Sequence, residues 1–468
     1  MVLLLVPPKI NNIDRDTGAD QLAPPAGLAY IASYLKNKGI NVKVIDAQAE
    51  KLDIKSFKEK IRETAPLVVG ITVHCSVQIT EAHLTAKLVK EISSNIKVVI
   101  GGSHPSALAR ETLEQCSYID IVVYGEGEVT MYETAENIKN NLPLNNIKGI
   151  AYRHNDKILI NPPRDFIDDL DSLDFPAFEL FPLNRYKPYF RSGSRCLELP
   201  VTTIRGCPSK CFFCYQPMSD NIRMRSPENI IKEIKYHIEN FNLKQVLFTD
   251  DTFTLYPDRI NKLCELLIKE RLYEKINWLC ASRVDIVNEE LLKIMKKAGC
   301  YCITYGVESG SQYILDKIKK NISLAQAKEA VRLTKKHGIK ADVNFIIGLP
   351  YETEKTIMQT IKFMNELDPD YVNIALLSIF PGTSAYEMAR LNTGGLKLLN
   401  SDWNKSGRIV GNMVELEEIP RTTLEFYQMK AYSSFYLRPS KILNLLKKID
   451  IKILLHYILH QLYSRFIR

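Results

Sequence analysis

Three cysteines in one short loop are the residues of this sequence most able to do chemistry. Cys207, Cys211 and Cys214 are spaced C-x3-C-x2-C, and the loop supplies no fourth cysteine. Three thiolates at this spacing can hold three corners of a [4Fe–4S] cube, which leaves the fourth iron open to a small molecule. A catalytic zinc site keeps an open coordination position in the same way. The spacing therefore predicts a cluster that acts on something bound to it.

A structural zinc site with a distant fourth ligand, or three buried thiols without function, are the alternatives. No histidine or cysteine follows Cys214 within twenty residues, and Cys196 is the nearest cysteine before the loop. Phe212, Phe213 and Tyr215 make the loop more apolar than most zinc-binding loops. These features favour the cluster over zinc.

The loop resembles the signature of radical S-adenosylmethionine (SAM) enzymes, in which an aromatic residue precedes the last cysteine. The resemblance implies a [4Fe–4S] cluster on Cys207, Cys211 and Cys214. It implies that the amino and carboxylate groups of SAM chelate the open iron. It also implies that Phe213 lies near the adenine.

Length and composition indicate a large intracellular protein. The chain has 468 residues, 46% of them hydrophobic, which is enough for two or three cores. The apolar run from Met1 to Val6 is too short for a signal peptide and is expected to be a buried strand. No apolar run in the sequence is long enough for a membrane-spanning helix. Ten cysteines without a secretory signal, together with an oxygen-labile cluster, predict a cytoplasmic protein.

The net charge of +8 is unevenly distributed. Residues 438–468 carry seven basic side chains and one acidic side chain, a net +6, which leaves +2 for the rest of the chain. A nearly neutral body gives no reason to expect a nucleic-acid partner.

Short β-rich runs alternate with helix-like stretches in residues 1–153. The alternation predicts a doubly wound parallel sheet of the flavodoxin or Rossmann type, with helices on both faces. Such sheets bind ligands beyond the carboxyl ends of their strands. The strands are expected at Val2–Val6, Val42–Ile45, Leu67–Val73, Lys97–Ile100 and Ile119–Tyr124.

Two glycine-rich loops follow the fourth and fifth of these strands. Glycine lets a backbone approach a ligand closely, and amides at a helix start favour anionic groups. Each loop alone is commonly only a turn, but both at one sheet edge predict a cofactor crevice. The first loop contains Gly101, Gly102, Ser103 and His104, and the second contains Gly125, Glu126, Gly127 and Glu128.

These two loops and the run Ala23–Tyr30 resemble the cobalamin-binding domain that precedes the barrel in one large class of radical SAM enzymes. The resemblance implies that both loops contact cobalamin. The segment Asn11–Gln21 contains Asp14 and Asp16 but lacks the histidine of the Asp-x-His-x-x-Gly motif. No histidine of that segment is therefore expected to ligate cobalt, and His104 either contacts the cofactor or caps its own helix.

A linker and a barrel are expected after the first domain. Residues 154–197 are rich in proline and carry an acidic run, which indicates a linker. Residues 198–395 contain six strand–helix repeats, which predict a partial (β/α)6 barrel whose active site lies at the carboxyl ends of its strands. The cysteine loop follows the first of these strands. Strands are expected near 199–204, 244–250, 276–281, 300–306, 340–347 and 371–379.

Polar residues or glycine follow the later strands of this barrel, namely Asp250, Asp251, Arg283, Glu308 and Gly348. Any one of them is commonly an ordinary turn residue, but their recurrence after successive strands indicates a shared site. The resemblance implies that they contact SAM. The acidic residues would bind the amino group or the ribose, Arg283 the carboxylate, and Gly348 the adenine. No residue is assigned a catalytic role.

The C-terminal region, residues 396–468, is expected to be mainly helical. Its last part, 439–468, places apolar residues at helical spacing with lysines on the opposite side. This helix is expected either to pack on the barrel or to lie at an anionic membrane surface. In the second case the enzyme is peripheral to the inner face of the membrane and meets a lipid-like substrate there.

These patterns together predict a cobalamin-dependent radical SAM enzyme. In the class that it resembles, such an enzyme most often methylates an unactivated carbon or similar centre, here of a small-molecule or lipid-like metabolite. The resemblance implies a 5′-deoxyadenosyl radical, methylcobalamin as methyl donor and a flavodoxin-type or ferredoxin-type electron donor. Cyclisation, rearrangement or oxidation without methyl transfer is the alternative reaction. A non-catalytic iron–sulfur or cobalamin-binding protein is the alternative class.

Overall fold

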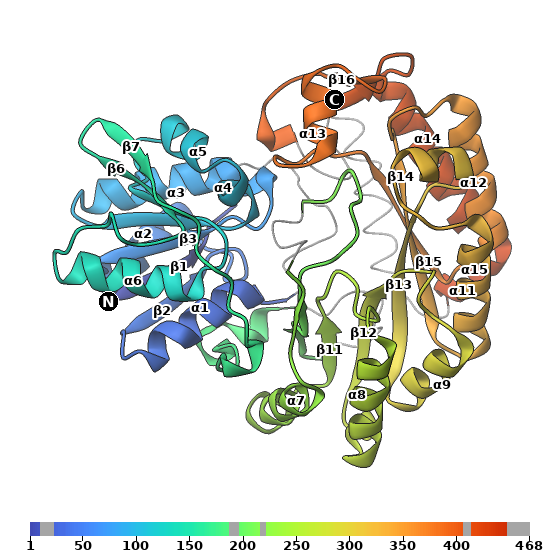
Figure 1. Cartoon of the computed structure of the whole chain (residues 1–468), viewed down its shortest axis with the longest axis horizontal. Coiled ribbons are helices and arrows are strands. Elements are labelled where there is room, and N and C mark those ends of the chain that lie inside the picture. Colours follow the sequence, from blue (N-terminus) through green and yellow to red (C-terminus); the bar gives the residue numbers. More distant parts are fainter. Residues whose placement is uncertain (10–22, 187–195, 216–220, 406–412, 447–468) are drawn as a thin grey trace.

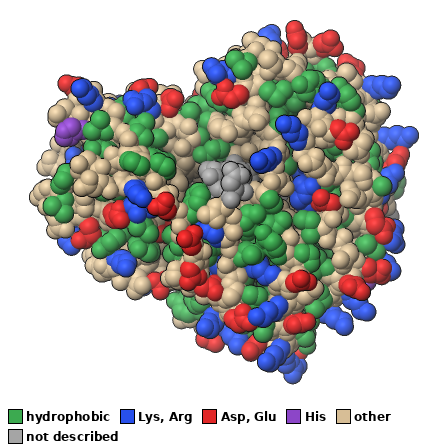
Figure 2. Space-filling view, viewed as in Figure 1, with side chains coloured by type: hydrophobic (Ala, Val, Ile, Leu, Met, Phe, Trp, Pro, Cys, Tyr) green, Lys and Arg blue, Asp and Glu red, His purple; other side chains and the backbone are tan. Residues whose placement is uncertain are grey.

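The chain folds into two lobes that meet along a notch, with the N-terminal lobe on the left of Figure 1 and the barrel on the right. Acidic and basic side chains are interspersed on the face shown in Figure 2, in agreement with the nearly neutral body of the sequence. The predicted segment Asn11–Gln21 and residues 447–468 of the predicted C-terminal helix lie outside the described residues. The computed structural model describes residues 1–9, 23–186, 196–215, 221–405 and 413–446.

The N-terminal lobe is built on a seven-stranded sheet with the order β2-β1-β3-β4-β5-β6-β7. Strands β1 to β5 pair in parallel in the order 2-1-3-4-5, which confirms the predicted flavodoxin-like winding. The strands are β1 Val2–Val6, β2 Val42–Asp46, β3 Val68–Thr72, β4 Lys97–Gly101, β5 Ile121–Val123, β6 Ile150–His154 and β7 Lys157–Ile160.

The hairpin β6–β7 was not predicted. Both strands pair antiparallel and extend the sheet to Ile160, seven residues past the expected domain end at 153. Asn161 ties the end of this hairpin to the body, because its buried side-chain amide donates to the carbonyl oxygens of Leu144 and Ile147 at 2.8 and 2.7 Å. The first residues of the predicted linker, 154–160, therefore belong to the sheet.

Helices cover both faces of this sheet, so the five residues of β1 are all buried. Local signals fix where the helices start. The side chain of Asp53, for example, accepts a hydrogen bond from the N–H of Ser56 at 2.8 Å and caps helix α2. The helices are α1 Ala26–Asn37, α2 Ile54–Thr64, α3 Ile79–Ile92, α4 Ser103–Ala107, α5 Ala109–Gln115 and α6 Glu128–Lys139.

The second lobe is a six-stranded parallel sheet with the order β15-β14-β13-β12-β11-β8. Each strand pairs with the strand before and after it in this series, while β8 and β15 form the two edges. This arrangement confirms the predicted partial (β/α)6 barrel. The strands are β8 Glu198–Val201, β11 Gln245–Phe248, β12 Asn277–Ser282, β13 Cys300–Glu308, β14 Lys340–Ile347 and β15 Tyr371–Leu376.

Most of the barrel helices lie outside this sheet, on the right and lower side of Figure 1, whereas the last of them, α13, lies at the top. Several begin at side-chain caps, such as Ser323 and Thr353, whose hydroxyls accept from the N–H of Gln326 and Thr356. The helices are α7 Pro227–Phe241, α8 Pro257–Lys269, α9 Glu289–Lys297, α10 Gln312–Lys317, α11 Leu324–Lys336, α12 Glu354–Leu367 and α13 Ser384–Arg390.

The C-terminal region covers the edge strand β15. Helix α14, Arg421–Tyr436, brings the hydroxyl of Tyr432 to 3.0 Å from the N–H of Ile374 and the side-chain amide of Gln428 to 2.8 Å from its carbonyl oxygen. Side chains thus satisfy backbone groups that an exposed edge would leave open. A small hairpin of β16 Leu396–Leu398 and β17 Val414–Leu416, which was not predicted, precedes α14.

The first part of the predicted C-terminal helix packs on the barrel. Helix α15 spans Pro439–Leu446, and Lys441 at its start is buried with its Nζ 3.0 Å from Asp368. Arg438 contacts the same carboxylate at 2.9 Å. Lys441 therefore binds the barrel. The alternative prediction, that this lysine faces an anionic membrane surface, is wrong for this residue. No helix among the described residues is long and apolar enough to cross a bilayer.

Candidate active site

The cysteine loop is closed by a short ribbon. Strand β9, Ile204–Arg205, pairs antiparallel with β10, Arg223–Met224, so that Arg205 lies opposite Arg223 at the two ends of the loop. Cys207 is buried, whereas Cys211 and Cys214 are half-buried. The N–H of Cys214 donates to the carbonyl oxygen of Cys211 at 3.0 Å. The loop follows the first barrel strand, where the repeat pattern had placed it.

Two cations and one carboxylate, from Lys320, Arg283 and Glu308, lie near the thiol of Cys211. Burial raises the pKa of Cys211, and the cations of Lys320 and Arg283 act in the opposite direction. Metal binding requires thiolates, so cations beside the thiols suit a metal-bound state. Three thiols of one loop with two adjacent cations fit a [4Fe–4S] cluster. Among the described residues, the three cysteines included, no three Cys, His, Asp or Glu side chains converge closely enough to hold a single metal ion.

Asp250 holds the segment that leads into the cysteine loop. Its buried carboxylate accepts hydrogen bonds from the N–H groups of Thr203 and Ile204 at 2.6 and 2.9 Å, and from the hydroxyl of Thr203. Burial raises the pKa of Asp250 to about 6, although these hydrogen bonds act against the rise. The carboxylate is thus engaged in holding β9, while the neighbouring Asp251 is exposed at the strand end. Contact of either residue with SAM stays a prediction.

Glu308 forms a buried ion pair that the sequence did not reveal. Its Oε1 lies 2.9 Å from the Nζ of Lys320, and each side chain is only 9% exposed. Burial lowers the pKa of Lys320, but Glu308 and the Cys211 thiol outweigh this effect and raise it. The ammonium also lies 5.9 Å from the ring of Phe213. The structure therefore brings two predicted residues, Glu308 and Phe213, together with the cysteine loop around Lys320.

Lys320 is turned inward by an unusual backbone. Lys319 and Asn321 on either side both have positive φ angles, 55° and 53°. Non-glycine residues adopt this region rarely, and the turn leaves Lys319 and Asn321 exposed while Lys320 is buried. No spacing in the sequence signals such a turn. The one available hint was three lysines close together at the end of helix α10, namely Lys317, Lys319 and Lys320.

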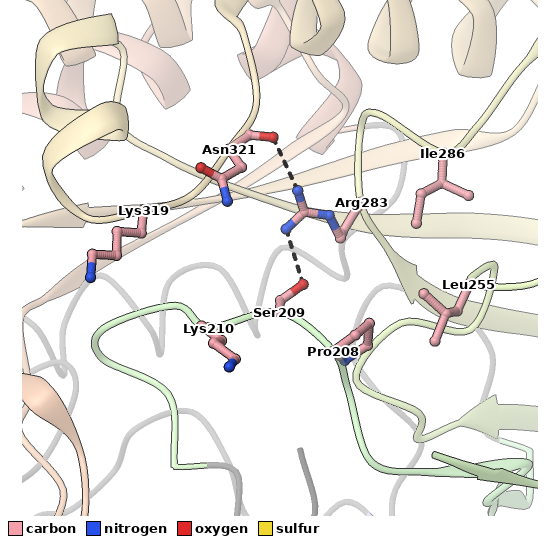
Figure 3. A pocket seen from close by; sticks show the side chains of 8 residues that line it. All are labelled: Pro208, Ser209, Lys210, Leu255, Arg283, Ile286, Lys319 and Asn321. Atoms are coloured by element: carbon pink, nitrogen blue, oxygen red, sulfur yellow. Dashed lines mark hydrogen bonds between the residues drawn. The ribbon is translucent and has the colours of Figure 1, made fainter. Parts of the chain in front are cut away.

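Arg283 links three loops around the cysteines. Its guanidinium forms a bidentate pair with Asp285 at 2.9 Å and donates to the hydroxyl of Ser209 at 3.2 Å and to the carbonyl oxygen of Lys320 at 3.1 Å. Figure 3 shows Arg283 reaching the cysteine loop through Ser209. Asp285 already compensates the charge of the guanidinium, and binding of the SAM carboxylate by Arg283 stays a prediction.

Gly348 occupies the turn after β14 with a φ of 87°, where glycine is favoured. Its N–H donates to Glu352 at 2.8 Å, and the N–H of Leu349 donates to the same carboxyl oxygen at 3.1 Å. Burial raises the pKa of Glu352 to about 8. Glu352 was not predicted; it fixes the glycine turn that was expected to approach the adenine.

The first glycine loop of the N-terminal lobe packs tightly. Gly102 has a φ of 121°, and a Cβ there would clash with the carbonyl group of Val73 on the neighbouring strand end. His104 is buried, shares a hydrogen bond with Ser76 at 3.0 Å and packs edge-on against Trp403, with 5.1 Å between the ring centroids. Burial lowers the pKa of His104 to about 4. A neutral imidazole thus joins this loop to the segment after the barrel.

Ser103 and Gly101 complete this loop. The hydroxyl of Ser103 donates to the carbonyl oxygen of His74 at 2.7 Å. Gly101 ends β4, and its carbonyl oxygen accepts from the N–H of Val73 at 2.8 Å. The backbones after β3 and β4 therefore lie against each other at the sheet edge where the topology places a ligand.

The second glycine loop faces the barrel. Gly125 has a φ of 80°, and its N–H donates to Ser106 at 3.2 Å. Glu126 points to Arg205, with 2.6 Å between Nη1 and Oε1. At Gly127 a Cβ would meet the side chain of Ile31 at 2.7 Å. Glu126 was expected to contact cobalamin, but Arg205, just before the cysteine loop, compensates its charge. Contacts of the second glycine loop with cobalamin stay predictions.

Comparisons with known proteins agree with this architecture. The family model of the radical SAM superfamily matches residues 201–364, and that of the B12 binding domain matches residues 18–135. An uncharacterized methyltransferase from Pyrococcus horikoshii is 36% identical over 445 residues, 95% of this chain and 94% of the relative. An anaerobic magnesium-protoporphyrin IX monomethyl ester cyclase from Rubrivivax gelatinosus is 31% identical over 78% of this chain and 66% of the cyclase.

The fold has a solved counterpart. The radical SAM methyltransferase TsrM from Kitasatospora setae, solved with cobalamin and a [4Fe–4S] cluster bound, superposes with a TM-score of 0.73 at 18% identity, over 94% of this chain and 89% of TsrM. The chain belongs to the radical SAM superfamily, in the class that carries an N-terminal B12-binding domain. It is a cobalamin-dependent radical SAM enzyme, as the sequence had indicated, and its cofactors are a [4Fe–4S] cluster, SAM and cobalamin.

Proposed function

We propose that this enzyme methylates an unactivated carbon, or a similar centre, of a small-molecule or lipid-like substrate. The observation that carries the proposal is the direct contact between the cysteine loop and the loop after β5 of the B12-binding lobe, at Arg205 and Glu126. This contact brings the two loops that we propose to hold the cofactors next to each other. The methyltransferase name of the relative from Pyrococcus horikoshii supports the same reaction. When bound, the cofactors supply radical generation and the methyl group; the chain supplies binding and orientation.

We propose that Cys207, Cys211 and Cys214 hold the cluster and that the Glu308–Lys320 pair receives the methionine part of SAM. A methionine zwitterion offers an ammonium and a carboxylate, which match the carboxylate of Glu308 and the ammonium of Lys320. Both charges are buried beside Cys211, where interactions between charges are strong. Phe213, Asp251, Arg283 and Gly348 would complete the site, with Phe213 and Gly348 against the adenine.

The test is anaerobic turnover with SAM labelled in its methyl group. Methyl transfer through cobalamin predicts two products of SAM, 5′-deoxyadenosine and S-adenosylhomocysteine, together with label in the substrate. A protein that only binds the cofactors would release neither compound above background, and the Cys207→Ala variant would then behave like the wild type. That result would remove the proposal.

A radical cyclisation or oxidation without methyl transfer is the second candidate, because cyclases are among the relatives at 31% identity over 78% of this chain. It predicts 5′-deoxyadenosine without S-adenosylhomocysteine. Crude anaerobic extract, fractionated by polarity, serves as a substrate source for both reactions. Label in an apolar fraction would identify a lipid-like substrate, and label in a polar fraction a small metabolite.

We also propose that an acidic flavodoxin-type or ferredoxin-type protein delivers electrons at a hollow over the cysteine loop. The hollow encloses about 490 Å³, and Pro208, Ser209 and Lys210 between two of the cysteines form one wall. Lys210 and Lys319 stand on one side of it in Figure 3. The charge-reversing variant Lys319→Glu should weaken reduction by flavodoxin at low salt and leave reduction by dithionite unchanged.

Peripheral membrane contact through the part of residues 439–468 that follows α15 is a further proposal. Lys447, Lys448 and Lys452 supply basic charge beyond the part of α15 that packs on the barrel. Flotation with vesicles that contain anionic lipid tests it. The full chain should float, a chain that ends at residue 446 should not, and equal flotation of the two would exclude a membrane role for this segment.

A further inference from the structure

Four charged side chains join the two lobes at the base of the cysteine loop. Glu126 and Glu128 come from the end of the β5–α6 loop and the first turn of α6, and Arg205 and Arg223 are the paired residues of β9 and β10. Arg205 donates to Glu126 and to Glu128, both at 2.6 Å. Arg223 donates to Glu126 at 2.9 Å. These four residues are called the interdomain ion cluster below.

The interdomain ion cluster is buried and balanced in charge. Exposed side-chain fractions are 3% for Glu126, 4% for Glu128 and Arg223, and 13% for Arg205. Burial acts to raise the pKa of Glu126, but Arg205, the N–H of Ile167 and Arg223 together hold it below the ordinary value. Two carboxylates facing two guanidinium groups satisfy the requirement that buried ions be paired. The geometry of the group is therefore tightly specified.

The position of the interdomain ion cluster gives it a role in addition to packing. Arg205 stands two residues before Cys207, the first thiol of the loop. Glu126 lies in the glycine loop at the carboxyl edge of the N-terminal sheet, where the topology places a ligand. From the barrel, Asp250 holds the same ribbon through the N–H of Ile204 at 2.9 Å. The ribbon at the base of the cysteine loop is thus attached to both lobes.

We propose that the interdomain ion cluster sets the separation between the two bound cofactors. Its residues are positioning residues in this role, because the role needs only their contacts with one another. The inference rests on the proposed function in assuming that the two loops hold cobalamin and the cluster. Methyl transfer needs both cofactors to approach one substrate atom in turn, and a displacement of about 1 Å can cost roughly a hundredfold in rate. Four side chains linked by three ion pairs resist such a displacement better than a single hydrogen bond does.

The experiment compares holoenzymes reconstituted with iron, sulfide and cobalamin. Arg205→Met removes the residue that contacts both carboxylates, Glu128→Gln weakens one contact only, and Arg205→Lys keeps the charge. Asp120→Asn is the matched control, because it breaks an ion pair with Lys90 at 2.7 Å within the N-terminal lobe. The first readout is the broadening of the cob(II)alamin EPR signal by the reduced cluster, which depends on the distance between the two centres. The second is the ratio of 5′-deoxyadenosine to methylated product.

Iron and corrinoid contents should stay at the wild-type level in Arg205→Met, while the EPR broadening falls and the product ratio rises by roughly tenfold. Glu128→Gln should give an intermediate effect, Arg205→Lys should recover most of the wild-type behaviour, and Asp120→Asn should change neither readout. A merely structural role would lower cofactor content and stability without changing the broadening of the molecules that remain loaded.

Unchanged broadening and an unchanged ratio in cofactor-loaded Arg205→Met would overturn the proposal. If that variant fails to fold, Glu128→Gln decides by the same two readouts, and wild-type values there overturn the proposal equally. If the wild type forms no methylated product, methyl transfer is wrong, but the EPR broadening still tests the separation of the two centres independently.

Discussion

The carboxyl edges of the two parallel sheets use their charged side chains in different ways. At the barrel edge, Glu308, Lys320 and Arg283 converge around the cysteine loop, and their charges lie next to the thiols. At the edge of the N-terminal sheet, His104 and Glu126 make their contacts with other segments, through Trp403 and Arg205. The barrel edge therefore gathers charged side chains around the cysteine loop. The N-terminal edge presents mainly backbone, and its side chains attach the lobe to the rest of the chain.

This difference suits the ligands that we propose. SAM carries an ammonium, a carboxylate and a sulfonium, and it needs compensating charges. A corrin is a large ring with amide substituents, and it can be received by a glycine-lined backbone surface. The same topological rule thus locates both sites, while the chemistry of each ligand determines whether side chains or backbone contact it.

The largest expected effect lies at the barrel edge. Replacing Cys207 with Ala removes one of three proposed cluster ligands, and we expect iron content to collapse and SAM cleavage to fall at least about a hundredfold. Iron and sulfide analysis with 5′-deoxyadenosine quantification measures this. Cys264→Ala, which removes a buried thiol in α8, is the control and should keep its iron. Full iron content in Cys207→Ala would contradict the proposed ligand set.

Lys320→Met should weaken SAM binding by roughly tenfold to a hundredfold, because it removes a charged partner and leaves Glu308 buried without its cation. Equilibrium binding of SAM to the reconstituted protein measures the change, and corrinoid content should stay constant. Lys317→Met, an exposed lysine three residues earlier, is the control. Equal affinities for SAM in the two variants would show that the Glu308–Lys320 pair does not bind it.

Gly102→Ala tests the backbone surface of the N-terminal edge. The added Cβ meets the carbonyl group of Val73, and the φ of 121° disfavours any side chain. We expect the variant to lose about 2 kcal/mol of stability in this lobe and part of its corrinoid, with SAM cleavage by the barrel retained. Gly27→Ala, where the added Cβ meets nothing within 4 Å, should behave like the wild type. Normal corrinoid content in Gly102→Ala would show that this loop does not receive the ring.

The smallest effect concerns pH. The pKa of Glu352 is raised from 4.5 to about 8 by burial, so the folded protein keeps a proton that the unfolded chain releases. Stability from this group is fully present below pH 4.5 and is lost as the pH rises towards 8. Urea unfolding between pH 5 and 8 should show a fall in the free energy of unfolding that Glu352→Gln reduces. Glu366→Gln, at an exposed site on α12, should keep the wild-type slope.

The sequence predicted regular elements better than it predicted side-chain roles. Apolar runs such as Val2–Val6 and the strand–helix repeats predicted the parallel strands, because burial on both faces leaves a continuous hydrophobic signal. The hairpin β6–β7 was missed because it is partly exposed and its signal is weak. For Asp250, contact with SAM stays a prediction, and the sequence did not reveal that its carboxylate accepts hydrogen bonds from Thr203 and Ile204.

The sequence by itself determined features that lie within a few neighbouring residues. Cys207, Cys211 and Cys214 lie within eight residues, so their spacing alone was enough to predict a [4Fe–4S] cluster. Only the tertiary structure decided which charged side chains pair with each other. Arg205 meets Glu126 across 79 positions of the chain, and Lys320 turns inward to Glu308 through a backbone turn that no motif encodes. Contacts of this kind depend on how the two lobes pack, and packing is set by the summed burial of many residues, which spacing along the chain does not record.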